Sequence, residues 1–218
     1  MELKYTTVIF DLDGTVLNTL EDLCDSVNYA LSKCAYPLRT IDEVRSFVGN
    51  GIGKLIERSA PEGTDRNDIE KFHAVFTAHY KEHCADKTRP YDGIIELLKK
   101  LRKEGVKTAV VSNKADYAVK SLCREYFPEL FDMAVGERDG IRRKPCPDSV
   151  IEVMDKIGAD RVKTVYIGDS DVDIATAKNA GVDSIAVTWG FRSKDFLQKH
   201  GATVMAENAE ELFNVLIG

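Results

Sequence analysis

Two aspartates stand two positions apart near the start of the chain, in the stretch TVIFDLDGTVLNTL. A short apolar run, Val8–Phe10, ends directly at Asp11, and Asp13 follows just before a Gly-Thr turn. Carboxylates this close repel each other and raise each other's pKa unless a positive charge lies near them. The pair therefore predicts a bound cation, or chemistry that transfers an anionic group.

Three further polar segments could complete such a site. They are VVSNK (110–114), RRKPCPD (142–148) and GDSDVD (168–173). Transfer of a phosphoryl group needs a nucleophile, donors that neutralise the phosphoryl oxygens, and a proton for the leaving oxygen. The chain offers a carboxylate for the first role and hydroxyl, amide and ammonium groups for the second.

These residues can be assigned roles in one reaction. Asp11 could attack phosphorus and form an aspartyl-phosphate, and Asp13 could protonate the leaving group. Mg²⁺, which prefers oxygen ligands, could lie between Asp11 and Asp169 and relieve the repulsion in the first pair. The donors to the phosphate would be Ser112, Asn113 and Lys144.

The elements that must position these residues follow from apolar periodicity. Strands are expected over Tyr5–Phe10, Val106–Val111, Met133–Val135, Thr164–Ile167 and Ser184–Val187, and helices over Ile94–Lys103, Tyr117–Tyr126, Ser149–Ile157, Ile174–Ala180 and Glu210–Ile217. Apolar strands that alternate with helices are typical of a parallel sheet covered on both faces. We therefore expect an α/β fold, a Rossmann-like sheet whose ligands bind at the carboxyl ends of the strands.

One segment departs from this alternation. From Asn18 to about Ala85 the sequence shows helical spacing and no convincing strand, and Thr40-Ile41-Asp42-Glu43 has the pattern of a capping box. We expect residues 18–85 to form an inserted all-helical cap domain, and residues 1–17 and 86–218 to form the core. Its glycine-rich segment GNGIGK (49–54) departs from the P-loop pattern and is expected to be a loop over the site that selects the substrate.

Composition limits the class of protein. The 218 residues carry a formal charge of -6, which argues against a nucleic-acid backbone as the main partner. No apolar run approaches the ~20 residues of a membrane span, and the N-terminus lacks the pattern of a signal peptide. The 5 cysteines are odd in number and include no C-x-x-C pair, so reduced thiols and a cytoplasmic location are expected.

Four motifs together resemble a known family. The stretches DLDGT (11–15), VVSN (110–113), KPCP (144–147) and GDSDVD (168–173) occur in the order seen in the haloacid dehalogenase-like superfamily, specifically its phosphatases. The helical insertion after the first motif matches the cap of that family. Parts of the cap and the C-terminal stretch VTWGFRSKDFLQKHGAT are similar to the bacterial phosphoglycolate phosphatases, and the related pyrophosphatases share much of this text.

The resemblance implies roles for individual residues. Asp11 would be the nucleophile and Asp13 the general acid and base. The Mg²⁺ ligands would be Asp11, the main-chain carbonyl of Asp13, and Asp169. The phosphate-binding residues would be Thr15, Ser112, Asn113 and Lys144. Asp173 would support the metal site or Lys144. Many relatives carry aspartate at the position of Asn18, near the hinge of the cap, so the resemblance does not define the details of the cap.

The sequence therefore predicts a Mg²⁺-dependent phosphatase for a small phosphorylated metabolite, with 2-phosphoglycolate as the first candidate substrate. An inorganic pyrophosphatase, a phosphatase for nucleotides or sugar phosphates, and a phosphomutase like β-phosphoglucomutase remain alternatives, because they share these motifs. A signalling receiver domain is disfavoured because it lacks the Asp-x-Asp-Gly-Thr turn and a helical insertion. A dehalogenase is disfavoured because Asp13 would have no role there.

Overall fold

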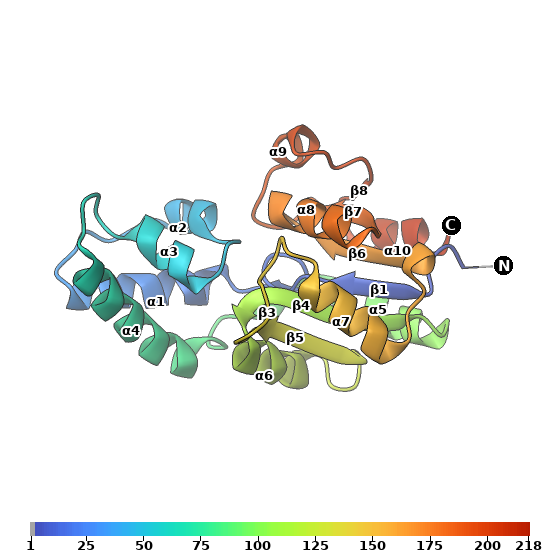
Figure 1. The fold of residues 1–218 in the computed structure, drawn as a ribbon, viewed down its shortest axis with the longest axis horizontal. Coiled ribbons are helices and arrows are strands. Elements are labelled where there is room, and N and C mark those ends of the chain that lie inside the picture. Colours follow the sequence, from blue (N-terminus) through green and yellow to red (C-terminus); the bar gives the residue numbers. More distant parts are fainter. Residues whose placement is uncertain (1–2) are drawn as a thin grey trace.

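The computed structural model describes residues 3–218 and has a six-stranded sheet at its centre (Figure 1). In chain order the strands of this sheet are β1 (Thr7–Phe10), β4 (Lys107–Ala115), β5 (Met133–Glu137), β6 (Thr164–Gly168), β7 (Asp183–Val187) and β8 (Met205–Ala206). They lie in the order β5-β4-β1-β6-β7-β8, and every neighbouring pair is parallel. The strand that carries the first aspartates therefore lies between the strands that carry the second and fourth motifs.

The register brings the ends of these three strands to the same level. Phe10 of β1 is paired with Val110 of β4 and with Ile167 of β6. Polar side chains follow these paired residues closely: Asp11 directly after β1, and Asp169 directly after β6. Because parallel strands end at a common edge, residues far apart in sequence meet there.

Helices cover both faces of the sheet, as an apolar parallel sheet requires. They are α5 (Ile94–Lys103), α6 (Asp116–Tyr126), α7 (Asp148–Ile157), α8 (Asp171–Ala180), the short α9 (Lys194–Lys199) and α10 (Ala209–Ile217), with a 3₁₀ turn at Arg161–Lys163. Buried residues of α5, α6 and α10 pack with Val8 and Phe10 of β1 in one apolar cluster. Those of α7 and α8 pack with Ile9 in another, so β1 is buried from both sides.

Four helices form a separate lobe, at the left of Figure 1. They are α1 (Leu20–Lys33), α2 (Ile41–Phe47), α3 (Ile52–Ser59) and α4 (Arg66–His83), and they enclose an apolar cluster of their own. The capping box predicted at the start of α2 is present, with Thr40 and Glu43 bonded in both directions. The chain enters and leaves the lobe through a two-stranded antiparallel ribbon of β2 (Leu17–Asn18) and β3 (Arg89–Pro90).

The expected fold class is confirmed, with differences at the ends of elements. The first strand begins at Thr7 rather than Tyr5, and β4 continues past Val111 to Ala115. The β2–β3 ribbon, α9 and β8 were not predicted, because elements this short carry too few residues to show a periodicity. The division at residues 17/18 and 85/86 stays a prediction; β2 spans the first point, and β3 begins three residues after the second.

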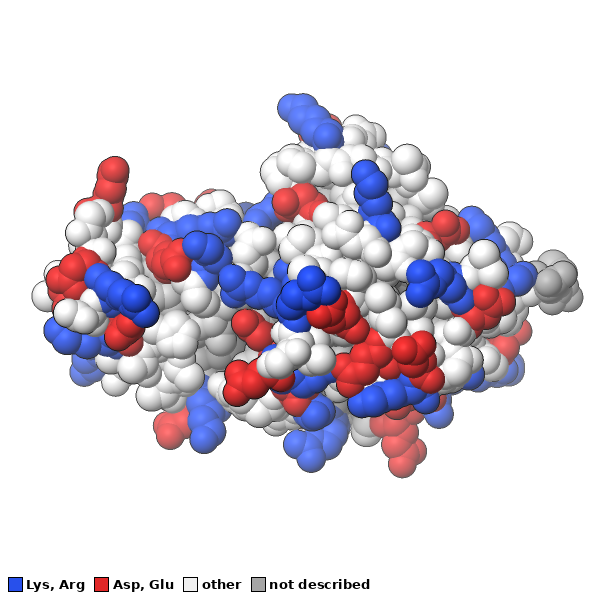
Figure 2. All heavy atoms as spheres, viewed as in Figure 1, with Lys and Arg blue, Asp and Glu red and all other residues white. Residues whose placement is uncertain are grey.

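The surface charges, the helices and the cysteines relate to the partners and the location that the sequence predicts. On the face drawn in Figure 2, basic and acidic side chains are interspersed over both lobes. Among residues 3–218, no helix combines the length and the apolar character needed to cross a membrane. The described cysteines are all free thiols.

Candidate active site

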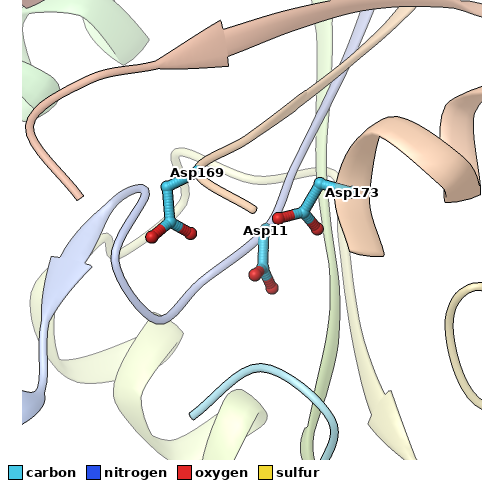
Figure 3. A group of neighbouring side chains, drawn as sticks. All are labelled: Asp11, Asp169 and Asp173. Atoms are coloured by element: carbon cyan, nitrogen blue, oxygen red, sulfur yellow. The ribbon is translucent and has the colours of Figure 1, made fainter. Parts of the chain in front are cut away.

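Three carboxylates converge at the carboxyl edge of the sheet. Asp11 follows β1, Asp169 follows β6, and Asp173 lies in the first turn of α8. All three are buried, and one oxygen of each lies within 4.8 Å of those of the others. Figure 3 shows the three side chains close together, with that of Asp11 between those of Asp169 and Asp173. Among residues 3–218, no other group of three acidic, histidine or cysteine side chains is placed to hold a metal.

Lys144 supplies the positive charge within this cluster. Its Nζ atom lies 2.9 Å from Oδ1 of Asp11 and 2.8 Å from Oδ1 of Asp173, and it donates a hydrogen bond to the Tyr166 hydroxyl at 2.9 Å. Burial alone would lower the pKa of Lys144, but the carboxylates of Asp11 and Asp173 raise it well above its usual value. Lys144 is therefore a permanent cation at the edge of the site.

One ammonium does not balance three carboxylates. Burial is the largest cause that raises the pKa of Asp11 to about 6, and Lys144 offsets it only in part. The pKa of Asp169 is also raised well above its usual value, first by burial and then by Asp173 and Asp11. These shifts indicate a site that holds more negative charge than its own residues neutralise.

A divalent cation fits this arrangement. Oδ1 of Asp11 is buried, and its one close polar neighbour is Nζ of Lys144, at 2.9 Å in an ion pair. Carboxylate oxygens are the ligands that Mg²⁺ prefers, and a divalent ion would balance the three carboxylates and one ammonium. The donor set around Asp11 and Asp169 is thus suited to Mg²⁺.

Asp13 also lines the cavity, but in a different set of contacts. Its carboxylate oxygens lie 3.0 and 3.3 Å from Nζ of Lys114, and Oδ1 accepts a hydrogen bond of 2.7 Å from the Thr19 hydroxyl. Lys114 is buried at the end of β4 and also bonds to the hydroxyl of Tyr80 in the cap helix α4. The second aspartate of the opening pair is therefore linked through Lys114 to the cap.

The residues predicted to bind phosphate are placed at different depths. Ser112 and Asn113 line the cavity, whereas Thr15 lies behind Asp169 and its hydroxyl donates to Oδ1 of that residue at 3.4 Å. The Asn113 side chain donates to the carbonyls of Lys144 and Gly49 and accepts from the Lys144 N–H at 2.9 Å. Its hydrogen bonds thus hold the Lys144 segment and the cap loop.

A glycine is required beside Asp169. Gly14 has φ +84°, and a Cβ atom there would lie 2.4 Å from Oδ2 of Asp169. No larger residue fits without moving that carboxylate. The Gly-Thr turn that follows the two aspartates therefore serves to bring the backbone close to Asp169.

The cavity over these residues is small and is closed by the cap. Its volume is about 50 Å³. The polar side is formed by Asp11, Asp13, Ser112, Asn113, Lys114, Asp169, Ser170 and Arg192, and the remaining wall by Leu23, Val48, Gly49, Gly51, Ile52, Leu55, Tyr80 and Phe191. At ~10–15 Å³ for each water, this volume holds about four water molecules. With the cap in this position, the small volume favours a small ligand.

The glycine-rich cap segment contacts the cavity through its backbone. Gly49 and Gly51 line the wall, and α3 begins at Ile52. The side chain of Asn50 accepts a hydrogen bond from Arg58, and Lys54 pairs with Glu57 at 2.5 Å. The sequence predicts that this segment selects the substrate; Asn50 and Lys54 are not among the residues that line the cavity.

Sequence reasoning did not assign roles to three residues at this site, Lys114, Tyr80 and Arg192. Lys114 directly follows Ser112 and Asn113, so the argument from strand ends could have found it. Tyr80 belongs to the apolar face of α4, and nothing in its spacing distinguishes it from the core residues Phe72 and Phe76. Arg192 contacts residues more than 140 positions away, which spacing cannot show.

The chain is similar in sequence to a known family of hydrolases and to individual phosphatases. Residues 8–187 match the family described as haloacid dehalogenase-like hydrolase. A phosphoglycolate phosphatase from Mesorhizobium japonicum is 33% identical over 86% of this chain and 84% of its own. An N-acetylmuramic acid 6-phosphate phosphatase from Pseudomonas aeruginosa is 32% identical over 98% of this chain and 96% of its own.

A solved structure agrees over nearly the whole length. It is of a protein from Lactobacillus delbrueckii subsp. bulgaricus provisionally named phosphoglycolate phosphatase, with 42% sequence identity, a TM-score of 0.95 and coverage of 99% of both chains. These similarities confirm the expected class of enzyme, a phosphoric monoester hydrolase that resembles phosphoglycolate phosphatases. The chain belongs to the haloacid dehalogenase-like hydrolase family.

Proposed function

We propose that this chain is a Mg²⁺-dependent phosphatase that hydrolyses a small phosphate monoester, with 2-phosphoglycolate as the leading candidate, through an aspartyl-phosphate on Asp11. The observation that carries the proposal is the buried Asp11 carboxylate, which lines the cavity and has one oxygen without a hydrogen bond. A carboxylate in that position, beside a cation and two further acids, is suited to attack phosphorus.

In the first step an oxygen of Asp11 forms a bond to phosphorus while the bond from phosphorus to the leaving oxygen breaks. Asp13 gives its proton to that oxygen, so the alcohol leaves neutral. Ser112 donates a hydrogen bond to the phosphoryl oxygens, and Lys144 balances their charge from behind Asp11. When bound by Asp11, the Asp13 carbonyl and Asp169, Mg²⁺ would add charge neutralisation at the same oxygens.

In the second step Asp13 takes a proton from water, whose oxygen attacks phosphorus and releases Asp11 and inorganic phosphate. Nζ of Lys114 lies 3.0 Å from the Asp13 carboxylate and holds this side chain in position for the step. Lys114 therefore supports the role of Asp13 as a base. Asp173 would hold Lys144 in position through their contact of 2.8 Å.

The size of the cavity favours a small leaving group. A cavity of about 50 Å³ favours the smaller phosphate esters over sugar phosphates. Lys114 and Arg192 line the cavity together with apolar residues, and their positive charge suits a substrate that carries an anion besides its phosphate. Larger phosphate esters would react only with the cap displaced.

A phosphate-release screen tests the proposal. It compares 2-phosphoglycolate, pyrophosphate, sugar phosphates, N-acetylmuramic acid 6-phosphate and nucleoside monophosphates with and without Mg²⁺. The highest kcat/KM should belong to 2-phosphoglycolate, with free inorganic phosphate as product. A preference for pyrophosphate or a sugar phosphate would show that 2-phosphoglycolate is not the main substrate. An isomeric phosphate as product would identify a mutase.

A further inference from the structure

Arg192 connects the core to the cap at the wall of the cavity. It lies in the loop between β7 and α9, on the core side of the molecule (Figure 1). Its guanidinium donates to the main-chain carbonyls of Arg45 at 2.8 Å, Ser46 at 3.3 Å and Val48 at 2.7 Å, at the C-terminal end of α2. A cation at that end also meets the negative end of the helix dipole.

The loop that carries Arg192 is fixed to the catalytic core. Trp189 donates through Nε1 to the carbonyl of Thr15 at 3.0 Å, and the N–H of Phe191 donates to Oδ2 of Asp169 at 2.6 Å. Gly190 allows this approach, since a Cβ atom there would lie 2.3 Å from Cβ of Asp169. Arg192 therefore extends toward the cap from a rigid base.

The guanidinium is held on a second side by α9. Its central carbon lies 5.7 Å from the centre of the Phe196 ring, a cation–π contact. The ring of Phe191 packs against the apolar cluster of the cap. Adjacent residues of one core loop thus contact the cap by an apolar surface and by hydrogen bonds.

The cap residues that Arg192 holds form part of the cavity wall. Val48 lines the cavity, and so do Gly49 and Gly51, which follow it. Elsewhere at the cavity, Asn113 donates a hydrogen bond to the Gly49 carbonyl and Lys114 bonds to the Tyr80 hydroxyl. Arg192, with two acceptors in α2 and a third at Val48, makes more hydrogen bonds to the cap than either of them.

We infer that Arg192 is a specificity-determining residue, which ties the end of α2 to the core and so fixes the small volume of the closed cavity. The inference rests on the proposed function, because it concerns which phosphate esters the site accepts. With the tie in place, a small ester is enclosed and reacts. Without it, the wall formed by Val48–Gly51 moves outward and the advantage of a small ester is lost.

The test measures kcat/KM for 2-phosphoglycolate and for 4-nitrophenyl phosphate, an ester with a bulkier leaving group. In Arg192→Ala the value for 2-phosphoglycolate should fall by roughly 10–100-fold, the effect of losing hydrogen bonds from a charged donor. The value for 4-nitrophenyl phosphate should change by less than about threefold, so that the preference itself is altered. Arg192→Lys keeps the positive charge but loses the forked set of N–H donors of the guanidinium. Its kcat/KM for 2-phosphoglycolate should lie between the values of the wild type and of Arg192→Ala.

Arg58→Ala is the matched control. Arg58 donates to the Phe47 carbonyl at 2.8 Å and to Asn50 at 2.9 Å, so it supports the same cap segment, but it belongs to α3 of the cap itself. This variant should keep the ratio of the two kcat/KM values. A ratio that is unchanged in Arg192→Ala, or lowered equally in Arg58→Ala, would overturn the inference.

Amide hydrogen exchange gives a readout independent of activity. Arg192→Ala should speed exchange both in cap residues 44–51 and in core residues 112–114, whereas Arg58→Ala should affect the cap residues alone. Unchanged exchange in core residues 112–114 would contradict the inference that Arg192 ties the cap to the core. If the wild-type chain hydrolyses none of the esters, the proposed function fails on its own, and the exchange experiment still decides whether Arg192 joins cap to core.

Discussion

The Asp11 carboxyl should make the metal-free protein less stable as the pH rises. Burial is the main cause that raises the pKa of Asp11 from its ordinary value of 3.8 to about 6. Because the folded chain then binds this proton more tightly than the unfolded chain, the stability is complete below about pH 4 and is lost as the pH rises through about 6. At ~1.4 kcal/mol for each pKa unit, the loss amounts to about 3 kcal/mol.

Asp11→Asn removes this titration. The free energy of unfolding of the variant, minus that of the wild type, should therefore grow by about 3 kcal/mol between about pH 4 and pH 7.5. Urea unfolding in the presence of a chelator, at a series of pH values, measures this difference. Asp139→Asn, at an exposed aspartate, sets the baseline for an Asp to Asn change. A difference that does not depend on pH would refute the reasoning.

Magnesium should act in the opposite direction. A ligand that binds only the folded chain raises its stability, so Mg²⁺ should stabilise the wild type at about pH 7.5 and stabilise Asp11→Asn less. The comparison uses the same unfolding assay with the chelator replaced by Mg²⁺. Equal stabilisation of both proteins would place the ion elsewhere.

Three further predictions concern single residues. Asp13→Ala should lose roughly 10²–10⁴-fold in kcat/KM on an alkyl phosphate and much less on 4-nitrophenyl phosphate, whose leaving group needs no proton; equal losses would contradict its role as acid. Asp169→Asn should shift Mg²⁺ activation to higher concentration, because an anionic ligand is lost, and an unchanged activation curve would remove Asp169 from the metal site. Gly190→Ala should destabilise the fold by about 1–3 kcal/mol, since its Cβ would overlap Asp169. Gly53→Ala, where no atom lies within 4 Å, should instead add about 0.5–1 kcal/mol in urea unfolding; the same sign for both glycine variants would refute the packing argument.

The part of the site that lies at strand ends could be predicted from the sequence. Asp11, Ser112 and Asp169 each follow an apolar run, and parallel strands bring such ends together. The four motifs then indicated the family, which the comparisons confirm. The fold class follows from the same alternation of strands and helices.

The contacts between cap and core could not be predicted in this way. The bond from Lys114 to Tyr80 and those from Arg192 to α2 join segments with no common periodicity, and they depend on how two lobes meet. Asn113 illustrates the limit within a motif, because its type and position suggest a phosphate donor while its side chain binds the Lys144 backbone. The short strands β2 and β3 pair only with each other. Neither strand can therefore be predicted from its own residues.

The covalent intermediate on Asp11 is the central claim, and Asp13→Ala offers the most direct test. With 4-nitrophenyl phosphate this variant needs no acid for the first step but lacks the base for the second. Rapid mixing should therefore give a burst of nitrophenolate equal in amount to the enzyme, and peptide mapping after an acid quench should find the phosphoryl group on Asp11. Nitrophenolate and phosphate released at the same rate without a burst, or a phosphoryl group on another residue, would contradict the account.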